Sequence, residues 1–418
     1  MTPATRRSLP LVAAVLAPVL AYACGGDSTG PTTTTGVPGG SITARTGNGQ
    51  TAYIGSLMPT TPQVLVRNAS GQPARSIAVT FAAHGGGGDG AVTSAVVATD
   101  STGVAGPGGW RLGNTAGKDT LTATVQGPAP VVFVATALPS QFTIVVRFIG
   151  STPPAAVQQA INHAVAKWQS AIVDSLGSVP LSIPAASCDT AQPAINETVR
   201  NLLVLVKIVS LNSATLGESG PCVLTQPGNL PVLGVMELNS GALSLLEQND
   251  LLNDVVEHEF AHLLGFGTIW DLDSLVQDTT SQDPWFSGPL AQAAFRNAMP
   301  SYTDKVVPVE AGGGSGTALA HWRESVMTNE LMTGFINLGS NPLSLVTIQQ
   351  MADLGYVVNP AAADPWPTTS AGGVGGVSPD IARLPGSATP PHTTALSGPL
   401  VLVNRSGTIV GTRRRPGR

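Results

Sequence analysis

The residues best suited to chemistry in this chain form one short run, His258-Glu259-Phe260-Ala261-His262. Histidines four positions apart project from the same face of a helix, so both imidazoles can bind one metal ion. Glu259 follows the first histidine, where it can act as a general base toward a water at the metal. Zinc is the metal that two or three imidazoles in tetrahedral geometry favour. The alternative, two core histidines around a glutamate, would leave a carboxylate beside a buried face, which is costly.

A catalytic zinc site needs a third protein ligand, since two histidines are not enough to hold the ion. The compact spacing of metzincin proteases places a histidine at position 268, but this chain has Thr268 there. The compact pattern is therefore excluded. The residues themselves leave two candidates open, His321 and an acidic residue downstream of the helix.

Two segments resemble the leishmanolysin-like metallopeptidases, in which a long insertion separates the helix from the third histidine. The first is HEFAHLLGFGTIW, and the second is GTALAHWRESVMTNELMTG, whose His321 lies 59 residues after His262. The resemblance implies that His321 is the third zinc ligand and that Met332 is the Met-turn residue beneath the metal. It also implies hydrolysis of protein or peptide substrates, with one catalytic zinc ion and Glu259 as the base.

The start of the chain has the pattern of an export signal. Residues 1–23 carry an early arginine pair and an apolar run too short to span a bilayer. Cys24 follows the small-residue cleavage site and resembles the lipidated cysteine of a bacterial lipoprotein, with ordinary signal cleavage as the alternative. Residues 24–40 are a Gly- and Thr-rich linker. We therefore expect an exported protein of the cell envelope, attached to a bacterial membrane through a lipid on Cys24.

Two cysteines, Cys188 and Cys222, remain once Cys24 is assigned to the anchor. In an exported protein, two such cysteines most simply pair as a disulfide. A thiol catalyst is the alternative, but no local feature marks either residue as a nucleophile. The pair also matches the disulfide position of related bacterial leishmanolysin-like sequences.

The composition excludes several classes of protein. Only 11% of the 418 residues are charged and the formal net charge is −5, so the chain lacks the basic pattern typical of nucleic-acid binding. It also has too few Glu and Lys residues for a long coiled coil. Its 42% hydrophobic content is enough for a substantial core. All nine glutamates lie between Glu197 and Glu330, a window that includes the candidate site.

The pattern of the chain predicts a multidomain protein. Residues 41–138 show short apolar alternations between Gly-rich turns, which predict an all-β sandwich, and segments such as GQPARSIAVTF resemble bacterial Ig-like domains. Residues 141–359 mix strands with amphipathic helices and predict an α+β domain, which by the resemblance is a metzincin-like zincin domain. Residues 360–418 read as a Pro- and Gly-rich tail with a terminal hairpin, and His392 in this tail is excluded as a ligand.

The favoured function is an exported zinc endopeptidase, with its substrate extended along an edge strand for which residues 232–238 are the candidate. The alternative is a cell-surface adhesion protein whose Ig-like module binds a partner and whose zinc site is structural or vestigial. The sequence predicts no nucleic-acid partner and leaves the oligomeric state open. Four aspartates follow the helix, and because their spacing lacks the regular pattern of a calcium loop, it favours a solvated insertion over a calcium site: Asp271, Asp273, Asp278 and Asp283.

Overall fold

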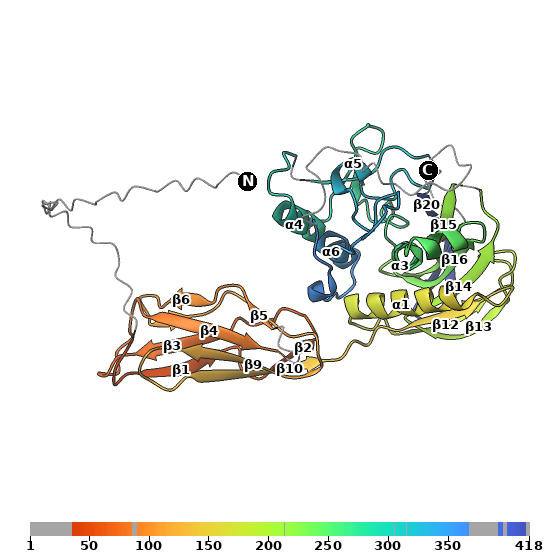
Figure 1. Cartoon of the computed structure of the whole chain (residues 1–418). Helices are drawn as coiled ribbons and strands as arrows, with labels where there is room; N and C mark the ends of the chain where they lie inside the picture. The colour runs from red at the N-terminus through yellow and green to blue at the C-terminus, as the bar shows by residue number, and fades with distance from the viewer. Residues whose placement is uncertain are drawn as a thin grey trace, which may run out of the picture.

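The computed structural model describes residues 36–85, 90–212, 214–304, 306–314, 316–367, 392–395 and 399–414. It contains an all-β module at the N-terminal side and a larger mixed domain after it (Figure 1). The export signal, Cys24 and most of the 24–40 linker lie outside the described residues. None of the described helices is both long enough and apolar enough to cross a membrane.

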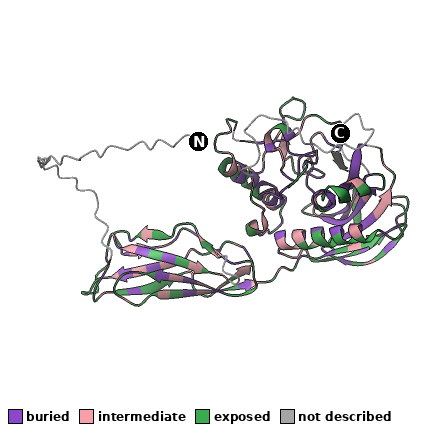
Figure 2. Cartoon of the chain, viewed as in Figure 1, coloured by how far each residue is buried: buried purple, intermediate pink, exposed green. Residues whose placement is uncertain are grey.

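Two main sheets and a shared core make up the N-terminal module. One sheet has the order β1-β3-β7, the other β2-β10-β9-β4-β6, and β5 pairs with β8. Alternate residues along β9 and β10 are buried, as Figure 2 shows, which is the pattern of strands with one face toward a core. The all-β prediction for this part agrees with these sheets. The strands are β1 (Ser41–Thr46), β2 (Gln50–Tyr53), β3 (Gln63–Arg67), β4 (Ala78–His84), β5 (Ala91–Val92), β6 (Val96–Ala98), β7 (Val104–Ala105), β8 (Trp110–Arg111), β9 (Gly117–Thr124) and β10 (Val131–Leu138).

The larger domain is built on a seven-stranded sheet. Six strands follow the order β11-β14-β16-β15-β21-β22, and the seventh, β20, pairs with β15. Strands β11, β14 and β16 run parallel, and β15 runs antiparallel to β16. A hairpin of β12 and β13 packs beside the sheet. The strands are β11 (Ile144–Phe148), β12 (Ser178–Ile183), β13 (Ile195–Arg200), β14 (Leu202–Val209), β15 (Thr215–Gln226), β16 (Pro231–Asn239), β20 (His392–Ala395), β21 (Leu400–Asn404) and β22 (Ile409–Arg413).

The two faces of this sheet are covered by different elements. Alternate side chains of β14 enter two separate cores: Leu202, Val204 and Val206 pack with the helices, whereas Leu203 and Leu205 pack with the β12–β13 hairpin. Figure 1 shows helices α1 and α3 on the same side of the sheet. The remaining elements are α1 (Ala155–Ala171), α2 (Leu243–Gln248), α3 (Leu252–Leu263), β17 (Val276–Gln277), β18 (Trp285–Phe286), α4 (Pro289–Ala298), β19 (Val307–Pro308), α5 (Glu324–Met327), α6 (Leu345–Asp353) and η1 (Pro360–Ala362).

The prediction that residues 232–238 form an edge strand is wrong. These residues belong to β16, which lies between β14 and β15 and is paired along both sides. Their nearly continuous apolar run is the pattern of a strand that is buried on both faces, and such strands lie inside a sheet. The long strand beside it, β15, has the outer position in the part of the sheet formed before residue 240.

The C-terminal part of the chain returns to this sheet. The predicted terminal hairpin is present as β21 and β22, but β21 also pairs in parallel with β15. Leu400 and Val403 of β21 are 1% and 0% exposed, so the hairpin is anchored in the cores. The sheet therefore extends well past residue 359, where the sequence placed the end of the domain. His392, which the sequence analysis set apart from the domain, begins β20 opposite Thr215.

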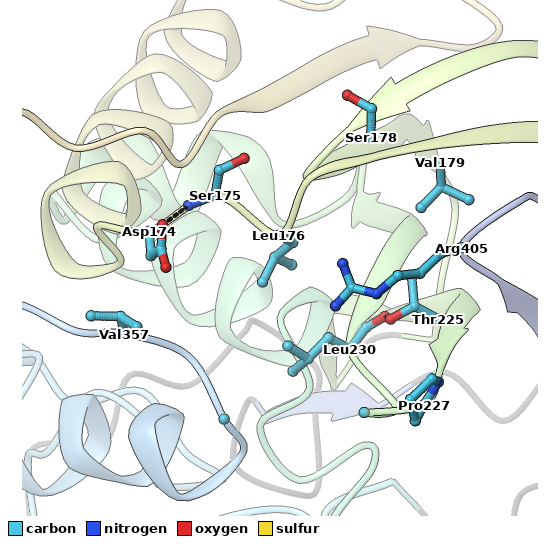
Figure 3. Close-up of a pocket in the computed structure, with 12 residues that line it drawn as sticks. Asp174, Ser175, Leu176, Ser178, Val179, Thr225, Pro227, Leu230, Val357 and Arg405 are labelled. Atoms are coloured by element: carbon cyan, nitrogen blue, oxygen red, sulfur yellow. Dashed lines mark hydrogen bonds between the residues drawn. The ribbon is translucent and has the colours of Figure 1, made fainter.

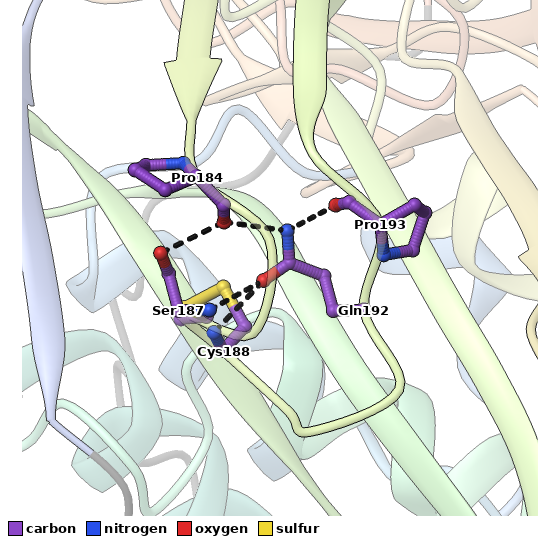
Figure 4. Close-up of a disulfide and its surroundings, with 6 residues drawn as sticks. Pro184, Ser187, Cys188, Gln192 and Pro193 are labelled. Atoms are coloured by element: carbon purple, nitrogen blue, oxygen red, sulfur yellow. Dashed lines mark hydrogen bonds between the residues drawn. A yellow bond between two sulfur atoms is a disulfide. The ribbon is translucent and has the colours of Figure 1, made fainter.

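A disulfide between Cys188 and Cys222 joins the loop after β12 to β15 (Figure 4). The loop is further held by Gln192, whose side-chain oxygen accepts hydrogen bonds from the backbone N–H groups of Ser187 and Cys188 at 3.0 and 2.9 Å. The amide group of Gln192 in turn donates to the carbonyl of Pro184 at 3.1 Å. The hydrogen bonds of Gln192 hold the shape of the loop, and the disulfide attaches the loop to β15.

The two modules touch where the end of α1 and the start of η1 lie in the larger domain. The Tyr53 hydroxyl donates to Asp174 Oδ1 at 2.7 Å, and the Asn359 amide donates to Asn114 Oδ1 at 2.9 Å. Gly55 fits against Asn359 so closely that an added Cβ would lie 1.6 Å from its Oδ1. These contacts hold the all-β module against the side of the larger domain that carries η1.

Candidate metal centre

Helix α3 carries two of the three histidines at the centre of the larger domain. His258 and His262 lie one turn apart on this helix, and His321 approaches from the loop before α5. The three Nε2 atoms form a nearly regular triangle, with separations of 3.0 Å (258 to 262), 3.1 Å (258 to 321) and 3.0 Å (262 to 321). Among the described residues, this is the only group of three or more metal-binding side chains close enough to hold one ion.

Backbone carbonyls set the orientation of all three rings. The Nδ1 atoms of His258, His262 and His321 lie 2.6, 2.9 and 3.0 Å from the carbonyl oxygens of Leu331, Phe266 and Thr317. A carbonyl only accepts, so each Nδ1 carries the proton and each Nε2 presents a lone pair. Three converging lone pairs repel one another, and none of them can donate to the next. A single cation between them would be attracted by all three, so this donor set fits a metal ion.

The charge state and burial of the histidines suit the same purpose. His258 is 2% exposed, and His262 and His321 are fully buried. Burial lowers the pKa of His258 to about 4, against the weaker opposing effect of its hydrogen bond to Leu331. The ring is therefore neutral at physiological pH, which is the form that binds a metal. A buried set of three imidazoles is the ligand type of catalytic zinc sites that keep a fourth position open.

Glu259 follows His258 on helix α3, and its side chain lies against β15. Its side chain is fully buried, and neither carboxylate oxygen accepts a hydrogen bond within normal geometry from the described residues, since the Ser219 hydroxyl donates to the Glu259 carbonyl. Burial raises the pKa of Glu259 to about 8, against the weaker opposing effect of the nearby Ser219 hydroxyl. The carboxylate is in contact with Gly217, where an added Cβ would lie only 2.7 Å from Oε1. A dry carboxylate of this kind is a strong base once it is ionised, and a neighbouring cation favours ionisation.

The segment around Met332 makes backbone contacts close to two of the histidines. Met332 is fully buried, and its carbonyl accepts a hydrogen bond from Trp322 N–H at 3.0 Å, next to His321. The preceding residue, Leu331, provides the carbonyl that orients His258. The segment therefore accepts a hydrogen bond from His258 and another from Trp322, the residue after His321.

Glu330, the last glutamate of the chain, has several hydrogen-bond partners. Its carboxylate accepts hydrogen bonds from Met332 N–H (2.6 Å), from Ser344 N–H and hydroxyl (3.1 and 2.7 Å) and from the Thr347 hydroxyl (2.5 Å). Burial raises the pKa of Glu330, and the hydrogen bond from Thr347 is the largest opposing effect. Glu330 thus ties the Met332 segment to the start of helix α6.

Gly267 is another residue that the sequence did not single out. It has a φ of +66°, and an added Cβ would lie 2.0 Å from the carbonyl oxygen of Ala320. Only glycine fits such a left-handed position at so close an approach. Thr268, at the position where the compact pattern has a histidine, donates through its hydroxyl to the carbonyl of His262 at 2.9 Å. The turn after α3 is therefore shaped to place His321 beside the helix.

The four aspartates that follow α3 do not form a common metal site. Asp273 accepts from the Asn229 amide at 2.9 Å, Asp278 accepts from the Trp285 indole at 3.0 Å, and Asp283 pairs with Arg323. Each of these carboxylates has a separate protein partner. They stabilise the insertion between α3 and His321.

A pocket of about 230 Å³ lies elsewhere in the domain (Figure 3). It is lined by the segment around Asp174 and Leu176, by the turn between β15 and β16, and by Arg405 of the C-terminal hairpin. Neither the histidines nor Glu259 line this pocket. The chemistry therefore points to the histidine centre, and the pocket has no part in it.

Comparison with known proteins points to the same part of the chain. The leishmanolysin family model matches residues 190–374. A leishmanolysin homolog from Crithidia fasciculata is 30% identical over 134 residues, which are 30% of this chain and 20% of that protein. The chain thus spans about a fifth of the length of the curated relative it matches. These matches support a leishmanolysin-like family, whose members are zinc-dependent metallopeptidases, for the region that contains all three histidines.

A solved structure, the D0-D1 domain of Intimin, is 23% identical and covers 22% of this chain and 46% of its own. The TM-score of this match is 0.17, which does not establish a common fold.

Proposed function

We propose that this chain is a zinc-dependent endopeptidase. One observation carries the proposal. Three buried histidines orient their Nε2 lone pairs toward one point, and Glu259, which follows His258 on α3, is also buried. A structural zinc site has no use for a dry carboxylate beside its ligands, because burying that group is costly. The position of Glu259 therefore favours catalysis over the adhesion hypothesis with a structural or vestigial site.

His258, His262 and His321 would hold the zinc ion, and Met332 would support them from beneath. The ion, when bound, would supply Lewis-acid chemistry toward the scissile carbonyl and lower the pKa of water. Glu259 would take a proton from the attacking water and deliver it to the leaving amine. Backbone carbonyls would keep the three rings in the required tautomer throughout.

The peptide substrate would pair with β15 instead of β16. The Thr215–Ser219 half of β15 runs along α3, since Ser219 donates to the carbonyl of Glu259 at 2.7 Å and Gly217 touches the Glu259 carboxylate. A peptide that adds to this edge gains backbone hydrogen bonds and passes the catalytic base. This proposal replaces the substrate strand that the sequence suggested.

We also propose that the protein is exported and lipid-anchored through Cys24, on the basis of the sequence pattern of residues 1–24. The all-β module, assigned here to the Ig-like class, would then space the peptidase domain from the membrane or bind a partner. Incorporation of a labelled fatty acid, lost in Cys24→Ser, tests the anchor.

The test of the main proposal compares the zinc-loaded protein with Glu259→Gln. We expect both proteins to hold one zinc ion per chain and only the parent to cleave an unfolded protein substrate. His321→Ala should reduce zinc content below one ion per chain. Retained hydrolysis in Glu259→Gln, or full zinc content in His321→Ala, would contradict the assigned roles.

A further inference from the structure

The outer edge of β15 beside the metal centre is covered by the C-terminal part of the same chain. Strand β20 pairs in parallel with β15, with His392 opposite Thr215, Thr394 opposite Glu218 and Ala395 opposite Ser219. Figure 1 shows β20 alongside β15 near helix α3. This is the half of β15 that contacts Glu259, so β20 takes the backbone positions that an extended substrate would use.

The burial of the site agrees with this closure. Thr215 and Ser219 on β15 are fully buried, as are Glu259, His262 and His321. A peptidase that acts on extended chains must expose the edge and the base to its substrate. The arrangement in this structure therefore corresponds to a covered form of the site.

The neighbouring strand explains how a short segment can remain on this edge. β21 follows on the same side of β15 and in the same direction, with Val401 opposite Val223. It is anchored by the buried Leu400 and Val403, whereas β20 has only four residues on the edge. From Ala395 to Val401 the chain advances six residues, whereas the paired part of β15 advances four, from Ser219 to Val223. A segment tethered so closely has an effective concentration on the order of millimolar at the edge.

We propose that residues 392–395 act as an intramolecular competitor for the substrate edge, so that release of this strand from Thr215–Ser219 opens the peptidase. The anchored hairpin β21–β22 would hold the competitor near the site, and β20 would be the part that leaves. This inference rests on the proposed endopeptidase function for its effect on activity. The pairing of β20 with β15 can be tested without any turnover.

The experiment uses the full zinc-loaded chain and the double variant Thr393→Pro/Thr394→Pro. Successive N–H groups of a strand point to opposite sides, so one of the two adjacent prolines removes a donor that faces β15, and β20 should leave while β21 and β22 stay. The matched control is Thr393→Val/Thr394→Val, which keeps both N–H groups and favours a strand. Amide hydrogen exchange of residues 215–219 is the first measurement. The proline variant should exchange these amides faster, and the valine control should resemble the parent.

Hydrolysis of a quenched fluorescent peptide is the second measurement. If the covered form outnumbers the open form by about ten to one, the proline variant should raise kcat/KM by about tenfold. Unchanged exchange at residues 215–219 in the proline variant would overturn the inference whatever the activity. Faster exchange without a gain in hydrolysis by an active parent would also overturn it. Faster exchange in a protein with no hydrolysis in any form would support the covered edge and instead refute the peptidase function.

Self-cleavage is checked by mass spectrometry of the stored parent. A chain cut within residues 391–398 would make the tail a substrate, and the competitor role would be wrong. An intact chain is the expected result.

Discussion

The substitution Gly217→Ala should move the carboxylate of Glu259, the proposed catalytic base, without destabilising the fold. The new Cβ would lie 2.7 Å from Glu259 Oε1, 3.0 Å from its Cδ and 3.1 Å from its Cγ. Since ordinary contact begins at 3.4 Å, the carboxylate must move by about 0.7 Å (3.4 − 2.7). The obstacle is the end of a flexible side chain, and Gly217 has no left-handed φ, so the fold can accept alanine. A base displaced by about 1 Å costs roughly 10²-fold in rate, which is about 2.7 kcal/mol of transition-state stabilisation.

We therefore expect zinc-loaded Gly217→Ala to lose about 10²-fold in kcat/KM with little change in Tm or zinc content. A quenched peptide assay, thermal unfolding and metal analysis provide the three measurements. Gly411→Ala in β22 is the matched control, because its added Cβ would meet nothing closer than 3.9 Å. Full activity of Gly217→Ala with zinc bound would refute the assignment of Glu259 as the base. Loss of zinc would refute it too, since the three nearest atoms to the new methyl all belong to Glu259.

Two further results are expected. Removal of zinc by a chelator should lower Tm, and zinc added at a hundred times its Kd should restore about 2.7 kcal/mol of unfolding free energy; an unchanged Tm would mean that the histidines bind no metal. Burial raises the pKa of Glu324 from its usual 4.5 to about 7, so the folded state binds the proton more tightly than the unfolded state, and stability is lost as pH rises from 4.5 through 7. Glu324→Gln stays neutral, so the unfolding free energy lost between pH 5 and pH 8 should be smaller by roughly 3 kcal/mol than in the parent. Chemical unfolding at the two pH values measures this, and the same pH dependence in both proteins would contradict it.

The elements recognisable from the sequence are those that local patterns define. Helix α3 follows from the apolar spacing around His258, and β14 and β16 follow from continuous apolar runs. The order of strands in the sheet is decided by packing between distant segments, so the pattern of β16 could not reveal that β15 lies outside it. The four residues of β20 carry no strand pattern of their own and pair only because β15 offers an open edge. The same limit applies to Glu330. Its partner Ser344, 14 residues away, precedes α6, and its partner Thr347, 17 residues away, lies on α6.

Strand β15 was missed for a reason connected with the site itself. Its sequence, TLGESGPCVLTQ, contains two glycines and a proline, which usually argue against a strand. Yet Gly217 leaves the space that the Glu259 carboxylate fills, and Gly234 on β16 lets Leu263 approach to within 2.5 Å of where a Cβ would stand. Both glycines allow α3 to lie close to the sheet, so the helix that carries two histidines is fixed against the edge proposed for the substrate. The glycines that weaken the strand pattern are therefore needed for α3 to pack beside the histidine centre. For this reason, strand propensity fails as a predictor at this site.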